Sequence, residues 1–172
     1  MEKMDTMSIF FACAMVIFLG GSFYVLYREY KKRQLKKQAA GGTSTLQMQL
    51  QAYERLTLLV DRIALPNLIS RVGTQLGFTA RDMQLLLTQN IKQEYEYNIT
   101  QQIYVSADAW TSIKNLKDQN INIVNQITNI LPEEATGIDL CKLIIEFLMN
   151  DRKGTLPDVV NEVLSFEAKK LM

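Results

Sequence analysis

The chain contains no histidine and has few cysteine, proline and glycine residues: its 172 residues include two Cys, three Pro and eight Gly. Without histidine, Ser-His-Asp and Cys-His catalysis and histidine-ligated metal sites are excluded. The glycines form neither GxGxxG nor GxxxxGK[ST], so these two modes of phosphate binding have no support. We therefore expect no catalytic residue, no metal and no cofactor, and no enzyme.

Charge is absent from Met7 to Tyr27, a stretch as long as the roughly 20 apolar residues that cross a bilayer. Its Leu, Ile, Val and Phe residues favour insertion by about 3–6 kcal/mol. The next ten residues carry six basic side chains, namely Arg28, Lys31, Lys32, Arg33, Lys36 and Lys37. Because basic flanks stay in the cytoplasm, the pattern predicts a transmembrane helix at 7–27, a short extracytoplasmic N-terminus at 1–6 and a cytoplasmic remainder.

A cleaved signal peptide is the alternative for this segment. Such a peptide has a basic start, a shorter apolar core and a small-residue cleavage site after the core. Here Glu2, Lys3 and Asp5 are acidic on balance, the core is long, and basic residues follow it, so we expect a retained anchor. The membrane would separate Cys13 from Cys141, which predicts neither a disulfide nor a shared zinc site.

Residues 28–45 are predicted to form a basic juxtamembrane strip and then a flexible linker, Ala-Ala-Gly-Gly-Thr-Ser-Thr at 39–45. Seven of the 19 basic residues and three of the 18 acidic residues lie in the first 37 positions, which leaves 12 basic against 15 acidic residues beyond them. This balance excludes a nucleic-acid partner. The strip instead predicts attraction of the chain to the bilayer, including anionic lipids, at about 1 kcal/mol per Lys or Arg near the surface.

From residue 46 onward, apolar residues recur at three-four spacing, and no window alternates convincingly with period two. The pattern predicts helices at 46–63, 67–76, from Thr79 to about 105, from Ser106 to about 131, at 138–150, and from near Pro157 to the C-terminus. Thr79 with Asp82 predicts a capping box, Ser106 an N-cap, and Gly77 a C-cap. The expected fold is all-α: one N-terminal transmembrane helix followed by a compact cytoplasmic domain, 46–172, of about five or six helices.

The densest polar and aromatic stretch is 94–104, followed by Trp110. On one continuous helix its side chains would lie on neighbouring faces at three-four spacing. One interpretation is a partner or ligand face or a polar contact between helices, and the more common one for such a stretch is a hydrated helix face whose Tyr rings cover the edge of the core. An enzyme that pairs Glu94 with a second acid is a further alternative. The candidate residues are Glu94, Tyr97, Asn98, Gln101, Gln102, Tyr104 and Trp110.

Asn120 interrupts an otherwise apolar stripe that includes Ile113, Leu116 and Ile127. A polar residue in such a stripe can set the register of a contact between helices, although an ordinary boundary residue explains it equally well. Together with the apolar segment 138–148, the stripe motivates a homo-oligomer as an alternative.

Several short motifs resemble those of a family of uncharacterised bacterial membrane proteins. They are Gln51-Ala-Tyr-Glu-Arg-Leu56, Glu94-Tyr-Glu-Tyr-Asn98, Gln101-Gln-Ile-Tyr-Val-Ser106, Ala109-Trp110, Leu131-Pro132 and Ala135-Thr-Gly137. The resemblance covers nearly the whole chain. It implies one N-terminal span, a helical cytoplasmic domain and a bacterial inner membrane, and it supplies no activity.

We therefore expect a membrane-anchored, non-enzymatic helical interaction or scaffold module, held at the cytoplasmic face of a bacterial inner membrane. The sequence does not identify its protein partner. The alternatives are a homo-oligomeric structural membrane protein, and a small-ligand binder or enzyme that uses helix 94–104.

Overall fold

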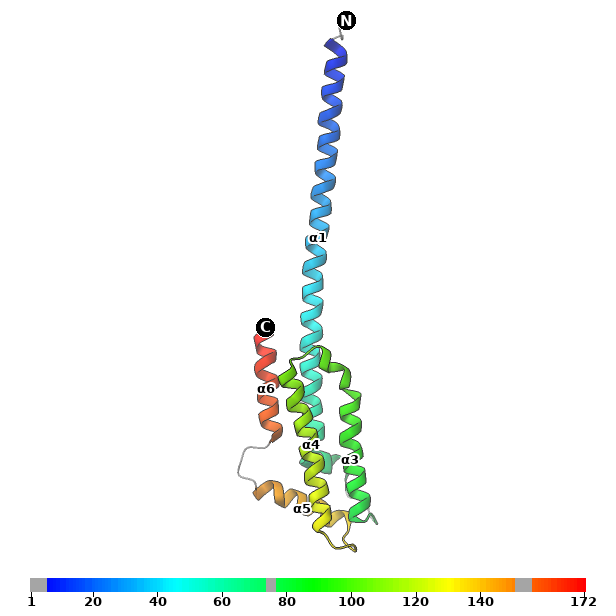
Figure 1. Cartoon of the computed structure of the whole chain (residues 1–172), viewed down its shortest axis with the longest axis vertical. Helices are drawn as coiled ribbons and strands as arrows, with labels where there is room; N and C mark the ends of the chain where they lie inside the picture. Colours follow the sequence, from blue (N-terminus) through cyan, green and yellow to red (C-terminus); the bar gives the residue numbers. More distant parts are fainter. Residues whose placement is uncertain (1–5, 74–76, 151–155) are drawn as a thin grey trace. The chain divides into compact units, whose positions relative to one another are not determined.

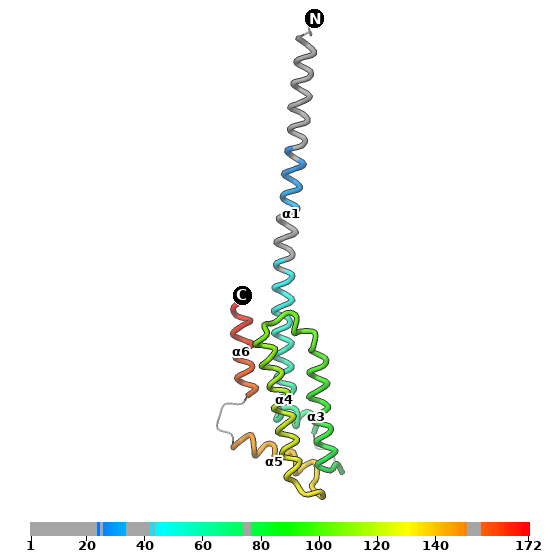
Figure 2. The backbone as a smooth tube through the Cα atoms, in the orientation of Figure 1, coloured from blue at the N-terminus to red at the C-terminus, as the bar shows by residue number. Residues whose placement is uncertain are grey.

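The computed structural model describes the backbone of residues 6–73, 77–150 and 156–172, and the side chains of these residues apart from 6–23, 25, 34–41 and 43 (Figure 2). The described residues form seven helices, which confirms the all-α class. In chain order these are α1 (Thr6–Ile63), α2 (Leu65–Val72), α3 (Ala80–Tyr97), the 3-10 helix η1 (Ile99–Ile103), α4 (Ala107–Ile130), α5 (Gly137–Asn150) and α6 (Leu156–Leu171). The chain divides into two compact units, Met1–Thr45 and Leu46–Met172.

The first unit consists of the N-terminal part of α1. The predicted span at 7–27 falls on this helix, but most of its side chains, like those of Lys36 and Lys37, lie outside the described residues. Within the described part of the chain, no helix is both long enough and apolar enough to span a membrane. The backbone is helical through 39–45, where composition predicts a flexible linker. Alanine is the best helix former, and each glycine there costs only about 1 kcal/mol.

The second unit is built around α3 and α4, which run side by side in opposite directions (Figure 1). α6 packs along α4, and α5 crosses the end of the unit where α3 begins and α4 finishes. η1 connects α3 to α4 at the opposite end of the unit. Residues 46–63 of α1 supply a further layer, because their apolar side chains enter the same core.

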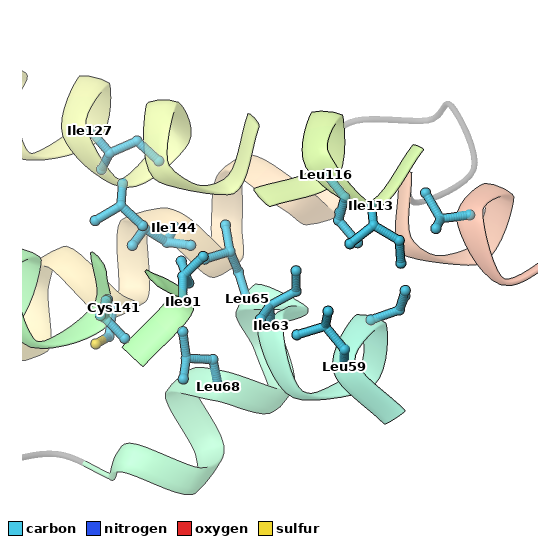
Figure 3. Close-up of a cluster of buried hydrophobic side chains, with 14 of the residues drawn as sticks. Leu59, Ile63, Leu65, Leu68, Ile91, Ile113, Leu116, Ile127, Cys141 and Ile144 are labelled. Carbon is cyan, nitrogen blue, oxygen red and sulfur yellow. The ribbon is translucent and has the colours of Figure 1, made fainter. Parts of the chain in front are cut away.

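One hydrophobic core holds this unit together. Helical spacing places one apolar face of each helix inward, where burial of a Leu or Ile side chain contributes about 1.5–3 kcal/mol. The close-up in Figure 3 shows side chains of α1, α2, α4 and α5 pointing toward one another. The largest side chains with almost no exposed surface are Leu56, Leu59, Ile63, Leu65, Leu68, Met83, Leu87, Ile91, Ile113, Leu116, Leu140 and Ile144.

The prediction for the third helix is wrong at the C-terminal end, because α3 stops at Tyr97 and does not continue to about 105. Asn98 ends it: its side-chain Nδ2 donates to the Glu94 carbonyl oxygen at 2.9 Å. The backbone of Asn98 turns to φ −101°, ψ 4°, and the chain continues as η1. An amide side chain that competes for backbone groups in this way disfavours a helix interior.

The second helix also differs from its prediction. α2 begins at Leu65 and ends at Val72, before the predicted limit of 76. Gly73 follows it at φ 71° and donates its N–H to the Ile69 carbonyl at 3.0 Å. Glycine reaches this positive φ without steric cost, so the helix ends at the first glycine and not at Gly77.

The N-termini of α3 and α5 are joined through two matching caps. The predicted box at Thr79 is confirmed: Asp82 N–H donates to Thr79 Oγ1 at 3.2 Å, and Thr79 N–H donates to Asp82 Oδ2 at 3.1 Å. Thr136 and Asp139 repeat both bonds at 3.3 and 3.0 Å. An isolated antiparallel bridge pairs Thr79 with Thr136. The two cap segments therefore fix the start of both helices together.

These caps predict sensitivity of the fold to acid. Hydrogen bonds from Thr79 and Thr136 hold the pKa of Asp82 and of Asp139 below the ordinary value of 3.8. A carboxylate with a lowered folded-state pKa stabilises the fold above its unfolded pKa, and this stability is lost as pH falls through the folded value. The double variant Asp82→Asn, Asp139→Asn should therefore lose less stability than wild type on acidification from about pH 5 to about pH 2.

Urea unfolding across that pH range measures this difference. The double variant Glu133→Gln, Glu134→Gln is the control, because both residues are exposed and the pH dependence should follow wild type. Parallel pH profiles for wild type and the cap variant would contradict the proposed role of the two carboxylates.

Candidate functional site: an amide-lined cavity

The residues predicted to form a partner or ligand face do not converge on one site. Asn98 is buried and caps α3. Glu94, with 18% of its side chain exposed, accepts from Arg62 Nη1 at 3.1 Å and lies 3.6 Å from Arg71 Nη2. Glu94 therefore faces two guanidinium groups, which is the environment of a structural ion pair and differs from the paired acids of a carboxylate enzyme.

The aromatic members of this set separate into two groups. Trp110 is half-buried, and its ring centroid lies 5.2 Å from that of Tyr95, at an interplanar angle of 31°. Lys117 Nζ lies 4.7 Å from the Tyr95 ring centroid, close enough for a cation–π contact. Tyr97, by contrast, is 76% exposed.

The remaining polar members lie at the end of the unit that η1 occupies. Gln101 is half-buried and donates to Thr100 Oγ1 at 3.3 Å. Gln102 is exposed and Tyr104 is half-buried. Ser106, the predicted N-cap of α4, is confirmed: its Oγ accepts from Ala109 N–H at 3.0 Å. Of these polar groups, Asn98 and Ser106 therefore cap helix ends, and Gln101 bonds to its neighbour in the chain.

A hydrogen-bonded junction joins α1, α4 and α6. Tyr53 Oη donates to Glu167 Oε2 at 2.7 Å, and Ser106 Oγ donates to the same oxygen at 2.6 Å. Burial, followed by the bond to Glu167, raises the pKa of Tyr53 from its ordinary value of 10.0. The neutral phenol donates here, and ionisation would place two negative charges in contact.

Ionisation of the Tyr53 phenol should therefore destabilise the fold under alkaline conditions. A phenol with a raised folded-state pKa contributes stability below its unfolded value, and this stability is lost as pH rises through the folded value. Tyr53→Phe should reduce the free energy of unfolding at neutral pH by about 1.5–3 kcal/mol, the range for a hydrogen bond to a charged group. It should also flatten the decline in stability from about pH 9 to about pH 11.5.

Chemical denaturation of Tyr53→Phe at a series of pH values tests this expectation. Tyr97→Phe is the matched control, because Tyr97 is 76% exposed and its loss should leave the profile unchanged. An alkaline decline equally steep in Tyr53→Phe and wild type would overturn the assignment.

Asn120 forms a buried hydrogen bond between two helices of the same chain. It is 5% exposed, and its Nδ2 donates to the Ile63 carbonyl at 2.7 Å, which satisfies a carbonyl at the C-terminal end of α1. Its stripe neighbours Ile113, Leu116 and Ile127 are buried in the core. The apolar segment of α5 also faces inward through Leu140, Cys141 and Ile144. Asn120, its stripe neighbours and these three α5 residues therefore make contacts within the chain.

Cys141 is buried, and burial raises the pKa of its thiol. Only the thiolate is a strong nucleophile. The environment of Cys141 therefore suits a small packed side chain better than a reactive one.

A cavity of about 700 Å³ lies where five helices meet in the second unit. The end of α1 and the start of α2 form one side, the middle of α4 another, and the end of α5 with the start of α6 the rest. Small-molecule sites commonly have volumes of about 300–1,000 Å³. The described part of the chain thus contains a cavity of suitable size, and none of the residues predicted to form a partner or ligand face is in its described lining.

Carboxamides dominate the polar lining of this cavity. They come from α2, α4 and α6 and are Asn67, Gln119, Asn120, Asn122, Gln126 and Asn161. Two carboxylates, Asp61 and Asp158, are the ionisable side chains among the described residues of the lining. Asp61 is oriented by Asn67, whose Nδ2 donates to Asp61 Oδ1 at 2.7 Å. Leu65, Ile123, Phe147, Leu148 and Leu156 are among the residues that form an apolar wall.

Asn161 is the distinctive member of this lining. Its side-chain Oδ1 is the single buried side-chain nitrogen or oxygen atom without a hydrogen-bond partner in the described part of the chain. A buried acceptor left unpaired costs about 1–3 kcal/mol. This atom is therefore available to accept a hydrogen bond from a bound molecule.

Spacing patterns do not predict this cavity, because its residues come from helices far apart in the chain. The sequence signal that points to it is the run of amides on α4, at Asn115, Gln119, Asn120, Asn122, Asn125, Gln126 and Asn129. The contacts decide which of them line the space: Asn125 instead accepts from Gln84 Nε2 at 2.8 Å.

A model of a family described as a family of unknown function, DUF7935, matches residues 3–171. No curated protein and no solved structure matches the chain.

Proposed function

Because the chain belongs to DUF7935, a family of unknown function, we propose its role from its own residues: it is a membrane-tethered, non-enzymatic interaction module. In this proposal residues 7–27 span the cytoplasmic membrane of a bacterium, with the N-terminus outside. The helical unit from Leu46 onward is held at the cytoplasmic face, where it binds a protein partner.

The observation that carries the proposal is the uncharged stretch Met7–Tyr27 followed directly by basic residues. Where the following side chains are described, Arg28, Lys31, Lys32 and Arg33 are exposed. Exposed cations on one flank of an apolar stretch favour retention of that flank in the cytoplasm. They also attract anionic headgroups at about 1 kcal/mol each near the surface.

Aromatic residues at the end of the stretch support the same placement. Tyr24, Tyr27 and Tyr30 are 65%, 58% and 63% exposed. Amphipathic rings favour the boundary between the headgroups and the hydrocarbon, where the ring is in apolar surroundings and the hydroxyl is hydrated. A span ending near Tyr27 would place these three rings at or near that boundary.

Exposed apolar side chains around η1 supply the partner face in this proposal. Tyr97, Ile99 and Ile103 are 76%, 42% and 71% exposed. Clustered apolar side chains on a surface are typical of interaction sites, and Tyr is enriched in them. These residues lie on or beside η1, between α3 and α4.

Crosslinking in membranes followed by purification of the full chain tests the proposal. The expected product is a specific adduct that is lost in the double variant Tyr97→Ser, Ile103→Ser. Ile130→Ser is the matched control, because Ile130 is 74% exposed at the other end of α4 and the adduct should persist. Recovery of only the monomer, or an adduct that survives in the double variant, would contradict the proposed face.

A further inference from the structure

We propose that the amide-lined cavity binds a nucleoside of the aminopurine class, with the edge of the base paired to the Asn161 side chain. This site is separate from the partner face around η1. Three features of the cavity carry the inference: a buried acceptor without a partner, carboxamides on two helices that pack together, and an apolar wall that includes an aromatic ring.

Asn161 sets the first requirement on a ligand. Its Oδ1 is buried and accepts no hydrogen bond from any described residue. A carboxamide carries this acceptor beside an NH2 donor, so a molecule that pairs fully with it presents a donor next to an acceptor. The edge of adenine has this arrangement, because its amino group donates and a ring nitrogen accepts, and Asn or Gln can pair with both at once.

Further carboxamides border the cavity along α4. Gln119, Asn122 and Gln126 follow one another at spacings of three and four residues, so they lie on one face of the helix over roughly 10 Å. All three side chains are exposed, which leaves their amide groups accessible to an entering molecule. Because α4 packs against α6, a base paired with Asn161 has these amides nearby for its sugar, whose hydroxyl groups both donate and accept.

The apolar wall suits the faces of a base. Phe147, on α5, contributes an aromatic ring, and Ile123, Leu148 and Leu156 add aliphatic surface. Proteins that bind a single unstacked base hold its ring between aromatic or apolar side chains and recognise its edge through hydrogen bonds. The cavity combines both kinds of surface within about 700 Å³.

The proposed contacts are hydrogen bonds and apolar packing, because a nucleoside carries no charge at neutral pH. A site built to hydrogen-bond a ligand group discriminates against an analogue that lacks this group, since the buried polar atom of the protein then stays unpaired. Binding should therefore depend on the amino group of the base, which would donate to Asn161 Oδ1.

Isothermal titration calorimetry with three uncharged probes tests this dependence. The probes are adenosine, purine riboside, which lacks the amino group, and methyl ribofuranoside, which lacks the base. Each is titrated into the full chain in a non-ionic detergent, with heats from empty micelles subtracted. Adenosine should bind at one site, purine riboside at least about tenfold more weakly, and the sugar more weakly still. No saturable binding of adenosine, or equal affinities for adenosine and purine riboside, would overturn the proposal.

A substitution then tests the residue. Asn161→Leu should weaken adenosine binding by at least about tenfold and abolish the preference for adenosine over purine riboside, because the paired amide is gone. Asn115→Leu is the matched control, since Asn115 is an exposed residue of α4 outside the described lining, and both the affinity and the preference should persist. Circular dichroism melting checks folding, and Asn161→Ala replaces Asn161→Leu if the latter does not fold. A preference for adenosine that survives in a folded Asn161 variant would reject the assignment.

Discussion

Replacing Leu116 with alanine is expected to lower the free energy of unfolding by about 2–5 kcal/mol, the range for large-to-small substitutions in a packed core. Leu116 has no exposed surface and lies on α4 opposite α1 (Figure 3). Truncation removes apolar contacts and leaves a void that fixed helices cannot close. Because whole domains are stable by only about 5–15 kcal/mol, this loss is a large fraction of the total.

Urea or thermal unfolding followed by circular dichroism measures this loss. Leu85→Ala is the matched control, since Leu85 lies on α3 with 58% of its surface exposed. It should change stability by no more than about 0.5 kcal/mol. Similar losses for the two variants would mean that α4 does not pack over α1 as described.

Placing two arginines in the proposed span should release the protein from the membrane. Each Arg at the centre of a span costs about 2.5–3.5 kcal/mol, against the roughly 3–6 kcal/mol by which the apolar residues favour insertion. The double variant Ile17→Arg, Leu19→Arg should therefore move from the carbonate-resistant membrane pellet to the soluble fraction when cells are fractionated.

The control for this substitution carries the same added charge elsewhere. Leu85→Arg with Ile130→Arg alters two side chains that are 58% and 74% exposed in the helical unit. This protein should remain in the membrane pellet with wild type. Wild type recovered in the soluble fraction, or a span variant that stays in the pellet, would contradict insertion of residues 7–27.

The helical class and several helix ends follow from local chemistry, which is why they could be predicted. Three-four spacing of apolar residues reports which face of a helix is buried. The caps at Thr79 and Ser106 depend on residues three positions apart or fewer, and both are confirmed. Membership in a family of unknown function is confirmed as well.

The errors arise where distant or competing contacts decide the outcome. Asn98 ends α3 because its side chain bonds to a backbone carbonyl one turn earlier, an option that apolar spacing does not reveal. Apolar spacing likewise does not identify the partner of Asn120, which is the Ile63 carbonyl on α1, 57 positions away. The same limit applies to the cavity, since its acidic and amide groups meet only after five helices have packed.

The most direct test of a tethered cytoplasmic module is protease protection of the full chain in a bacterial host, with antibodies against the helical unit. The proposed topology predicts that this unit survives protease added to intact spheroplasts and is digested in inside-out membrane vesicles. Digestion from outside the spheroplasts would contradict it, because the basic flank and the helical unit would then lie on the opposite side of the membrane.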